Sequence, residues 1–83
     1  MLTVSVISPE AILFEGQTES VVAPAFDGQV GILTGHAPMM TLLGSGELRL
    51  GGQGGGPRFQ VSGGFLQVVD DTVRVVTEHA SKT

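Results

Sequence analysis

Hydrophobic and polar residues alternate along this chain in short segments. Residues Leu2–Ile7 run in near alternation and Glu47–Leu50 alternates strictly, as expected for strands with one buried face. Similar segments recur at residues 11–15, 19–23, 58–62, 65–69 and 72–77. Glycine, proline and aspartate, which are common in turns, separate these segments. The spacing predicts an all-β sandwich or barrel, and no segment keeps helical periodicity.

The stretch 27–41 is the most distinctive part of the sequence, and it reads Asp-Gly-Gln-Val-Gly-Ile-Leu-Thr-Gly-His-Ala-Pro-Met-Met-Thr. Its three glycines predict a turn, a short strand around Ile32 and a second tight turn. A β-branched residue at Gly31 is expected to be costly if that position needs a positive φ. The apolar run Met39–Leu43 has two interpretations, a central core strand or a strand covered by another protein.

The alternating pattern also predicts which side chains form the core. These are Val4, Val6, Leu13, Val21, Ile32, Leu48, Leu50, Phe59, Val61, Phe65, Val68, Val73 and Val75. Three segments are predicted to connect strands: a mobile glycine-rich hairpin loop at 51–57 and turns at Gly63-Gly64 and Asp70-Asp71.

Composition narrows the functional classes. The chain has 83 residues, which is one domain at most, and a formal net charge of −4 with only four lysines and arginines. Clustered positive charge is needed to bind nucleic acid or an anionic membrane surface, so neither partner is expected. Cysteine is absent, which excludes disulfides and thiolate sites. No apolar run reaches the roughly 18 residues of a membrane span, and no signal peptide is recognised. Because a secreted domain of this size usually needs disulfides, the lack of cysteine favours a setting that faces the cytosol.

The candidate chemistry is sparse. His36 and His79 lie far apart without a metal-ligand spacing, and the residues Asp70-Asp71 suit a turn better than acid–base catalysis. The glycine-rich segment 51–57 lacks the lysine and following helix of a phosphate-binding loop. The sequence therefore predicts no catalytic residue, no metal, no cofactor and no small-molecule substrate, and favours a surface that binds another protein.

Three motifs occur together in this chain. Residues 27–41 resemble the signature region of the epsilon subunit of F-type ATP synthases. The segment Phe59-Gln-Val-Ser-Gly-Gly-Phe-Leu-Gln-Val68 and the ending Val73-Arg-Val-Val-Thr-Glu-His-Ala80 are similar to later motifs of that family, in the same order. Thr34 departs from the family, which usually has proline there.

The resemblance implies a fold and an architecture. It implies a ten-stranded β-sandwich of two antiparallel sheets, with residues 1–80 forming the sandwich and 81–83 a polar tail. The family commonly continues into a helical hairpin that can restrain ATP hydrolysis and sometimes binds ATP. These 83 residues do not include it, so no inhibitory element and no ATP site are expected within them.

The resemblance also implies a function, that of a non-catalytic rotor subunit. Such a subunit links the gamma subunit to the membrane c-ring and couples ion translocation to ATP synthesis, without inserting into the membrane. Its implied c-ring contact is Asp27, Gly28, Gln29, Val30 and Gly31. Its implied gamma contact is Ser8, His36 and Thr41. The implied location is peripheral, on the cytoplasmic face of a bacterial plasma membrane or the equivalent organelle face. A stand-alone β-sandwich adaptor for another protein is the alternative.

Overall fold

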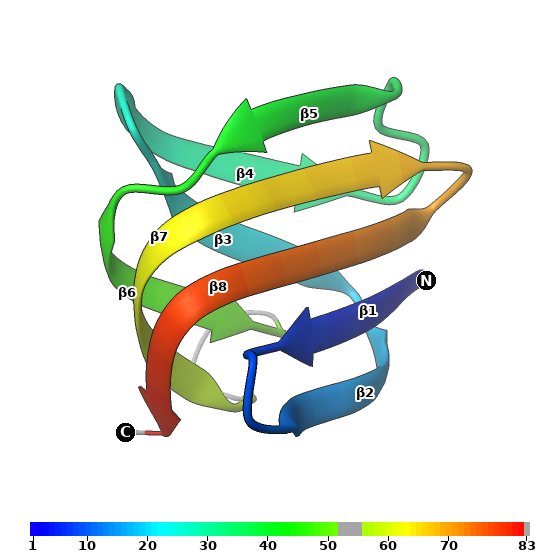
Figure 1. Cartoon of the computed structure of the whole chain (residues 1–83). Helices are drawn as coiled ribbons and strands as arrows, with labels where there is room; N and C mark the ends of the chain where they lie inside the picture. Colours follow the sequence, from blue (N-terminus) through cyan, green and yellow to red (C-terminus); the bar gives the residue numbers. More distant parts are fainter. Residues whose placement is uncertain (52–55, 83) are drawn as a thin grey trace.

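The computed structural model describes residues 1–51 and 56–82, and these residues form eight β-strands (Figure 1). The strands are β1 (Leu2–Ile7), β2 (Ile12–Thr18), β3 (Ser20–Ala25), β4 (Gly28–Leu33), β5 (Met39–Leu42), β6 (Ser45–Leu50), β7 (Arg58–Val69) and β8 (Thr72–Lys82). No helix occurs within the described ranges, so the all-β prediction is confirmed. The loop predicted at 51–57 falls mostly outside those ranges, as does Thr83.

The strands are hydrogen-bonded in the order β2-β1-β8-β7-β6-β3-β4, and β5 pairs with β7. In Figure 1, β5, β7 and β8 cross the front of the molecule, while β3 and β4 lie behind them. All pairs are antiparallel except β1 with β8, which are parallel. The prediction of purely antiparallel sheets is therefore wrong at this pair. No tight turn joins these two strands, because they lie at opposite ends of the chain, and only a tight turn enforces antiparallel pairing.

Strands β7 and β8 are long and pass through a bend. Residues 58–62 of β7 pair with β6, whereas residues 65–68 pair with β5. Between them, Gly63 and Gly64 have φ angles of 74° and 103°. The predicted turn at these glycines is wrong, because the strand continues through them in unbroken register with β8. This continuity explains the count of eight strands: dividing both long strands at the bend would give the ten that were expected.

The bend also reverses which residues of β7 point inward. Phe59 and Val61 are buried before the bend, but Leu66 and Val68 are buried after it. Phe65, predicted to be in the core, is instead half-buried on the outer face, and Leu66 takes the core position.

The remaining core agrees closely with the predicted pattern. Leu13 is only partly buried, although it packs against the core. The buried apolar residues are Leu2, Val4, Val6, Val21, Ala23, Ile32, Leu43, Leu48, Leu50, Phe59, Val61, Leu66, Val68, Val73 and Val75. They come from six of the eight strands and the residue after β5, so one continuous core holds the two layers together.

The last strand extends beyond its predicted end at Thr77. Pairing between β7 and β8 continues to Lys82, with Ser81 opposite Gln60. The division into a domain of residues 1–80 and a tail of 81–83 stays a prediction.

Candidate partner-binding surface

An apolar row crosses the outer face of the sandwich. Cross-strand pairing places Leu42 of β5 beside Phe65 of β7, Phe65 beside Val76 of β8, Val76 beside Ile7 of β1, and Ile7 beside Ile12 of β2. Directly opposed residues point to the same face of a sheet, so these five side chains form one band. We call them the apolar row: Leu42, Phe65, Val76, Ile7 and Ile12.

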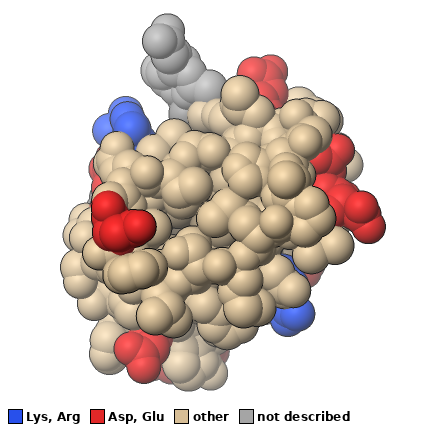
Figure 2. Space-filling model, turned by 90° about the horizontal axis from the view of Figure 1, so that it is seen from above, with Lys and Arg blue, Asp and Glu red and all other residues tan. Residues whose placement is uncertain are grey.

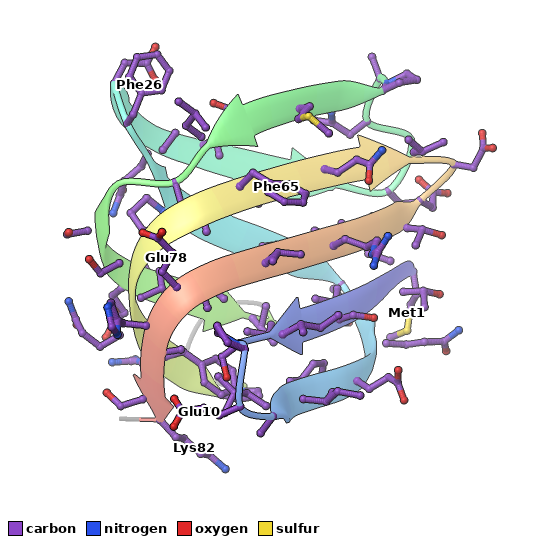
Figure 3. The ribbon with its side chains drawn as sticks, in the orientation of Figure 1. Met1, Glu10, Phe26, Phe65, Glu78 and Lys82 are labelled. Atoms are coloured by element: carbon purple, nitrogen blue, oxygen red, sulfur yellow. The ribbon has the colours of Figure 1, made fainter. Side chains whose placement is uncertain are left out.

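The ends of the apolar row are the most exposed. Leu42 is 62% exposed and Ile12 is 59% exposed, while the three middle residues are half-buried. Phe65 lies over β7 on the face turned toward the viewer in Figure 3. Apolar side chains spaced singly over a surface are ordinary, whereas apolar side chains grouped across neighbouring strands favour contact with another macromolecule.

The neighbouring row on the same face is more polar. It contains Met40, Gln67, Arg74, Ser5 and Glu15, which are paired in that order across the same strands. The outer face therefore presents an apolar row beside a mixed polar row. This arrangement resembles the apolar centre and polar rim of protein–protein interfaces.

The end of the sandwich that carries β4 and β5 is also poor in charge. Figure 2 looks onto this end, and the charged side chains lie toward its margin. Phe26 in the β3–β4 turn and Leu33 at the end of β4 are 66% and 65% exposed. The amide of Phe26 donates to the carbonyl oxygen of Leu42 at 3.0 Å, which brings this end next to the apolar row.

Strand β5 shows which side chains of the run Met39–Leu43 face the core and which are exposed. Met40 and Leu42 are exposed, whereas Met39 packs against the core and Leu43 is buried. One face of the run therefore belongs to the core and the other is available to a partner.

The predicted c-ring residues lie together at this end. Asp27 is in the β3–β4 turn, and residues 28–31 form the first part of β4. Gly28 has a φ of 132°, as the turn requires. Gly31 does not have a positive φ, and a β-carbon built there meets no atom within 4 Å. The positive φ that would make a β-branched residue costly at Gly31 is therefore absent.

The predicted gamma residues lie in three different elements. Thr41 is opposite buried Leu66, so its side chain is on the inner side of β5, between the exposed Met40 and Leu42. Ser8 closes the β1–β2 turn, where its amide donates to the carbonyl oxygen of Ala11 at 2.9 Å. Ser8 directly follows Ile7 and Thr41 directly precedes Leu42, so both are sequence neighbours of residues of the apolar row.

His36 lies in the β4–β5 loop, which is held from two sides. Its amide donates to the carbonyl oxygen of Leu33 at 3.1 Å, and its Nδ1 lies 2.7 Å from the carbonyl oxygen of Ala37. The preceding amide, of Gly35, donates to Asp71 Oδ1 at 2.7 Å. The β7–β8 turn therefore positions the loop that carries His36, a contact that the sequence analysis missed.

Replacing Asp71 is expected to release this loop. Asp71 has a φ of 59°, a conformation that alanine adopts less readily. Together with the lost hydrogen bond, Asp71→Ala should lower the free energy of unfolding by about 2 kcal/mol and speed hydrogen exchange at Gly35. Urea unfolding and amide exchange measure the two effects. Asp71→Asn is the control, because it keeps both the turn preference and an acceptor oxygen, and equal losses in the two variants would contradict this role.

The described residues do not suggest another kind of site. Among residues 1–51 and 56–82, no three histidine, aspartate or glutamate side chains gather closely enough to hold a metal ion. The same ranges contain no helix with the length and apolarity of a membrane span.

The family model described as "ATP synthase, Delta/Epsilon chain, beta-sandwich domain" matches residues 1–83. This chain belongs to the ATP synthase delta/epsilon family. Among its relatives, the ATP synthase epsilon chain of Leptospira borgpetersenii is 44% identical over 80 residues, covering 96% of this chain and 63% of the relative. The epsilon chain of Synechococcus sp. strain JA-2-3B'a(2-13) is 40% identical over 81 residues, covering 98% and 59%. The chain thus spans less than two thirds of the length of these family members.

Solved structures support the same fold for this delta/epsilon chain. A chain in the Euglena gracilis mitochondrial ATP synthase, in a structure of OSCP, F1 and the c-ring, aligns with a TM-score of 0.86 at 23% identity, covering 98% of this chain and 52% of that one. A chain in the central stalk and c-ring of the Tetrahymena thermophila mitochondrial ATP synthase aligns with a TM-score of 0.78 at 17% identity, covering 96% and 65%.

Proposed function

We propose that this chain is a non-catalytic central-stalk subunit of an F-type ATP synthase, which links the gamma subunit to the c-ring and couples ion translocation to ATP synthesis. Membership of the delta/epsilon family and epsilon-chain relatives that match nearly the whole chain support this assignment. The location that follows is peripheral, on the cytoplasmic face of a bacterial plasma membrane or the equivalent organelle face.

The apolar row is the observation that best supports a contact with the gamma subunit. Its five side chains follow one another across five strands, with a shift of the β1–β2 register at Ile7, and Ser8 and Thr41 adjoin Ile7 and Leu42 in the sequence. A partner seated on this row would bury apolar area and touch the surroundings of both residues. Aromatic side chains often contribute most of the affinity of an interface, and Phe65 is the aromatic residue of this row, between Leu42 and Val76.

We propose that the other contact, with the c-ring, lies at residues 27–31. These residues lie in the β3–β4 turn and β4 (Figure 1), close in the sequence to the exposed Phe26 and Leu33. The row and this end meet at Leu42, so a single rigid sandwich can hold two partners at adjacent surfaces. Rigidity suits a rotor part, because a loop that deforms under torque transmits it poorly.

Binding to the gamma subunit from the same source tests the proposal. In a calorimetric titration, one-to-one binding is expected, and Phe65→Gln should weaken it by about thirtyfold because a central apolar contact is lost. Gln67→Ala is the matched control, since Gln67 lies two residues further along the same strand and face, in the polar row. It should change the affinity less than about threefold.

His36→Ala and Thr41→Ala test the remaining predicted gamma residues in the same titration. If the folded chain does not bind gamma, the central-stalk role is wrong and the stand-alone adaptor becomes the better hypothesis. If the chain binds but Phe65→Gln and Gln67→Ala behave alike, the gamma contact is not on the apolar row.

A further inference from the structure

Strand β4 forms one edge of the sheet. It pairs with β3 in an unbroken antiparallel register, in which Val30 is opposite Ala23 and Ile32 is opposite Val21. Within residues 1–51 and 56–82, no strand pairs with its other side. The backbone groups directed to that side are therefore open to a partner.

Hydrogen bonds around β3 show which groups these are. The carbonyl oxygens of Ser20 and Pro24 accept bonds from Gly51 and Gly44, at 2.9 and 2.8 Å, so even-numbered residues of β3 are turned away from β4. Because bonding direction alternates along an antiparallel strand, the odd-numbered residues of β3 bond to Gly28, Val30 and Ile32.

It follows that Gln29, Gly31 and Leu33 direct their amide and carbonyl groups outward. The bond from the His36 amide to the Leu33 carbonyl agrees with this direction. Gln29 and Gly31 therefore offer two amide donors and two carbonyl acceptors on the open side of β4. Both residues are exposed.

Nothing in β4 protects this edge. Natural edge strands are usually blocked by lysine, proline or a bulge, yet β4 reads Gly-Gln-Val-Gly-Ile-Leu and has none of these. A β-carbon built at Gly28 or Gly31 meets no atom within 4 Å, so the sheet face is uncovered at these two positions.

The side chains of residues 28–31 offer a partner very little. Gly28 and Gly31 have none, Val30 packs against the core, and Gln29 has a neutral amide. Any tight contact at this segment must therefore use the backbone. Backbone pairing accepts a polar partner loop as readily as an apolar one, because its hydrogen bonds do not depend on side chains.

We propose that β4 receives an extended loop segment of the c-ring as an additional strand, bonded to the amide and carbonyl groups of Gln29 and Gly31. This inference rests on the proposed function, which places the c-ring at residues 27–31. It adds the mode of recognition, which is strand addition to an existing sheet.

Hydrogen exchange in the assembled complex tests the inference directly. The probe is a complex of this chain with gamma and the c-ring from the same source in detergent micelles, with exchange read residue by residue by mass spectrometry. The amides of Gln29 and Gly31 should exchange rapidly in the chain alone and at least tenfold more slowly in the complex. The amides of Val30 and Ile32 should be protected in both, because they already bond to β3.

Two substitutions at one position give the matched comparison. Gly31→Pro removes the outward amide without breaking any bond to β3, and Gly31→Ala keeps that amide. Gly31→Pro should weaken c-ring binding at least about tenfold, and Gly31→Ala less than about threefold.

The outcomes separate the two proposals. If the complex forms but Gln29 and Gly31 stay unprotected, strand addition is wrong while the central-stalk role stands. If no complex forms with gamma and the c-ring, the central-stalk role falls, and this inference with it. Protection in the chain alone that rises with its concentration would identify a second copy of the chain as the occupant and overturn the c-ring as partner.

Discussion

Gly64→Ala is expected to lower the free energy of unfolding by about 3 kcal/mol or more, which is a large share of the stability of a small domain. Gly64 has a φ of 103°, and a β-carbon added there would collide with the carbonyl oxygen of Val76. Both the strain and the collision involve backbone, so no side-chain movement relieves them. Urea unfolding followed by circular dichroism measures the loss.

Alanine substitutions at two other glycines provide comparisons for the expected loss of stability at Gly64. Gly31→Ala adds the same methyl group where φ is ordinary and no atom lies within 4 Å, so its effect should stay within about 0.5 kcal/mol. The loss of unfolding free energy in Gly63→Ala should lie between those at Gly64 and Gly31. Its closest clash is with the carboxylate end of Glu78, which can move. Equal losses at Gly64 and Gly31 would mean that the bend does not require glycine.

Phe59→Ala is expected to cost about 3–5 kcal/mol, the usual range for removing a buried phenylalanine side chain. Phe59 is 1% exposed and is among the largest fully buried side chains, opposite Leu48 of β6. Its removal leaves a cavity in the layer that contains β6. The midpoint of thermal unfolding should fall by roughly 15 °C or more.

Phe65→Ala is the control for that substitution. Both phenylalanines are on β7, but Phe65 lies beyond the bend and on the outer face. Its loss should therefore cost only about 1 kcal/mol of unfolding free energy. A larger loss at Phe65 than at Phe59 would contradict the reversal of inward and outward positions along β7.

The sequence predicted the strands well because hydrophobic and polar residues alternate within most of them. It failed at Gly63-Gly64, where a glycine pair suits both a chain reversal and a bend within one strand. The choice depends on pairing with residues 72–82, which local pattern does not contain. Phe65 was placed in the predicted core, whereas the strand after the bend directs Leu66 and Val68 inward and Phe65 outward.

The candidate surface was less predictable than the core. Leu42 and Ile12 are thirty positions apart in the sequence and are joined only through the register of three intervening strands. Asp71 was correctly interpreted as a turn residue, but its bond to Gly35 links two separate turns. The resemblance to a family supplied residue numbers for the contacts, whereas the apolar row required the pairing itself.

The parallel pairing of β1 with β8 has a consequence for biosynthesis. Strand β1 leaves the ribosome well before its neighbour β8, since Thr3 is opposite Thr72 and Ile7 is opposite Val76. Until then, the inner side chains of β1, Leu2, Val4 and Val6, lack the neighbours that bury them. We therefore expect this domain to fold after its translation is complete, and slowly, since contacts between distant residues limit folding rates. A nascent chain stalled before β8 is the form that most needs a chaperone.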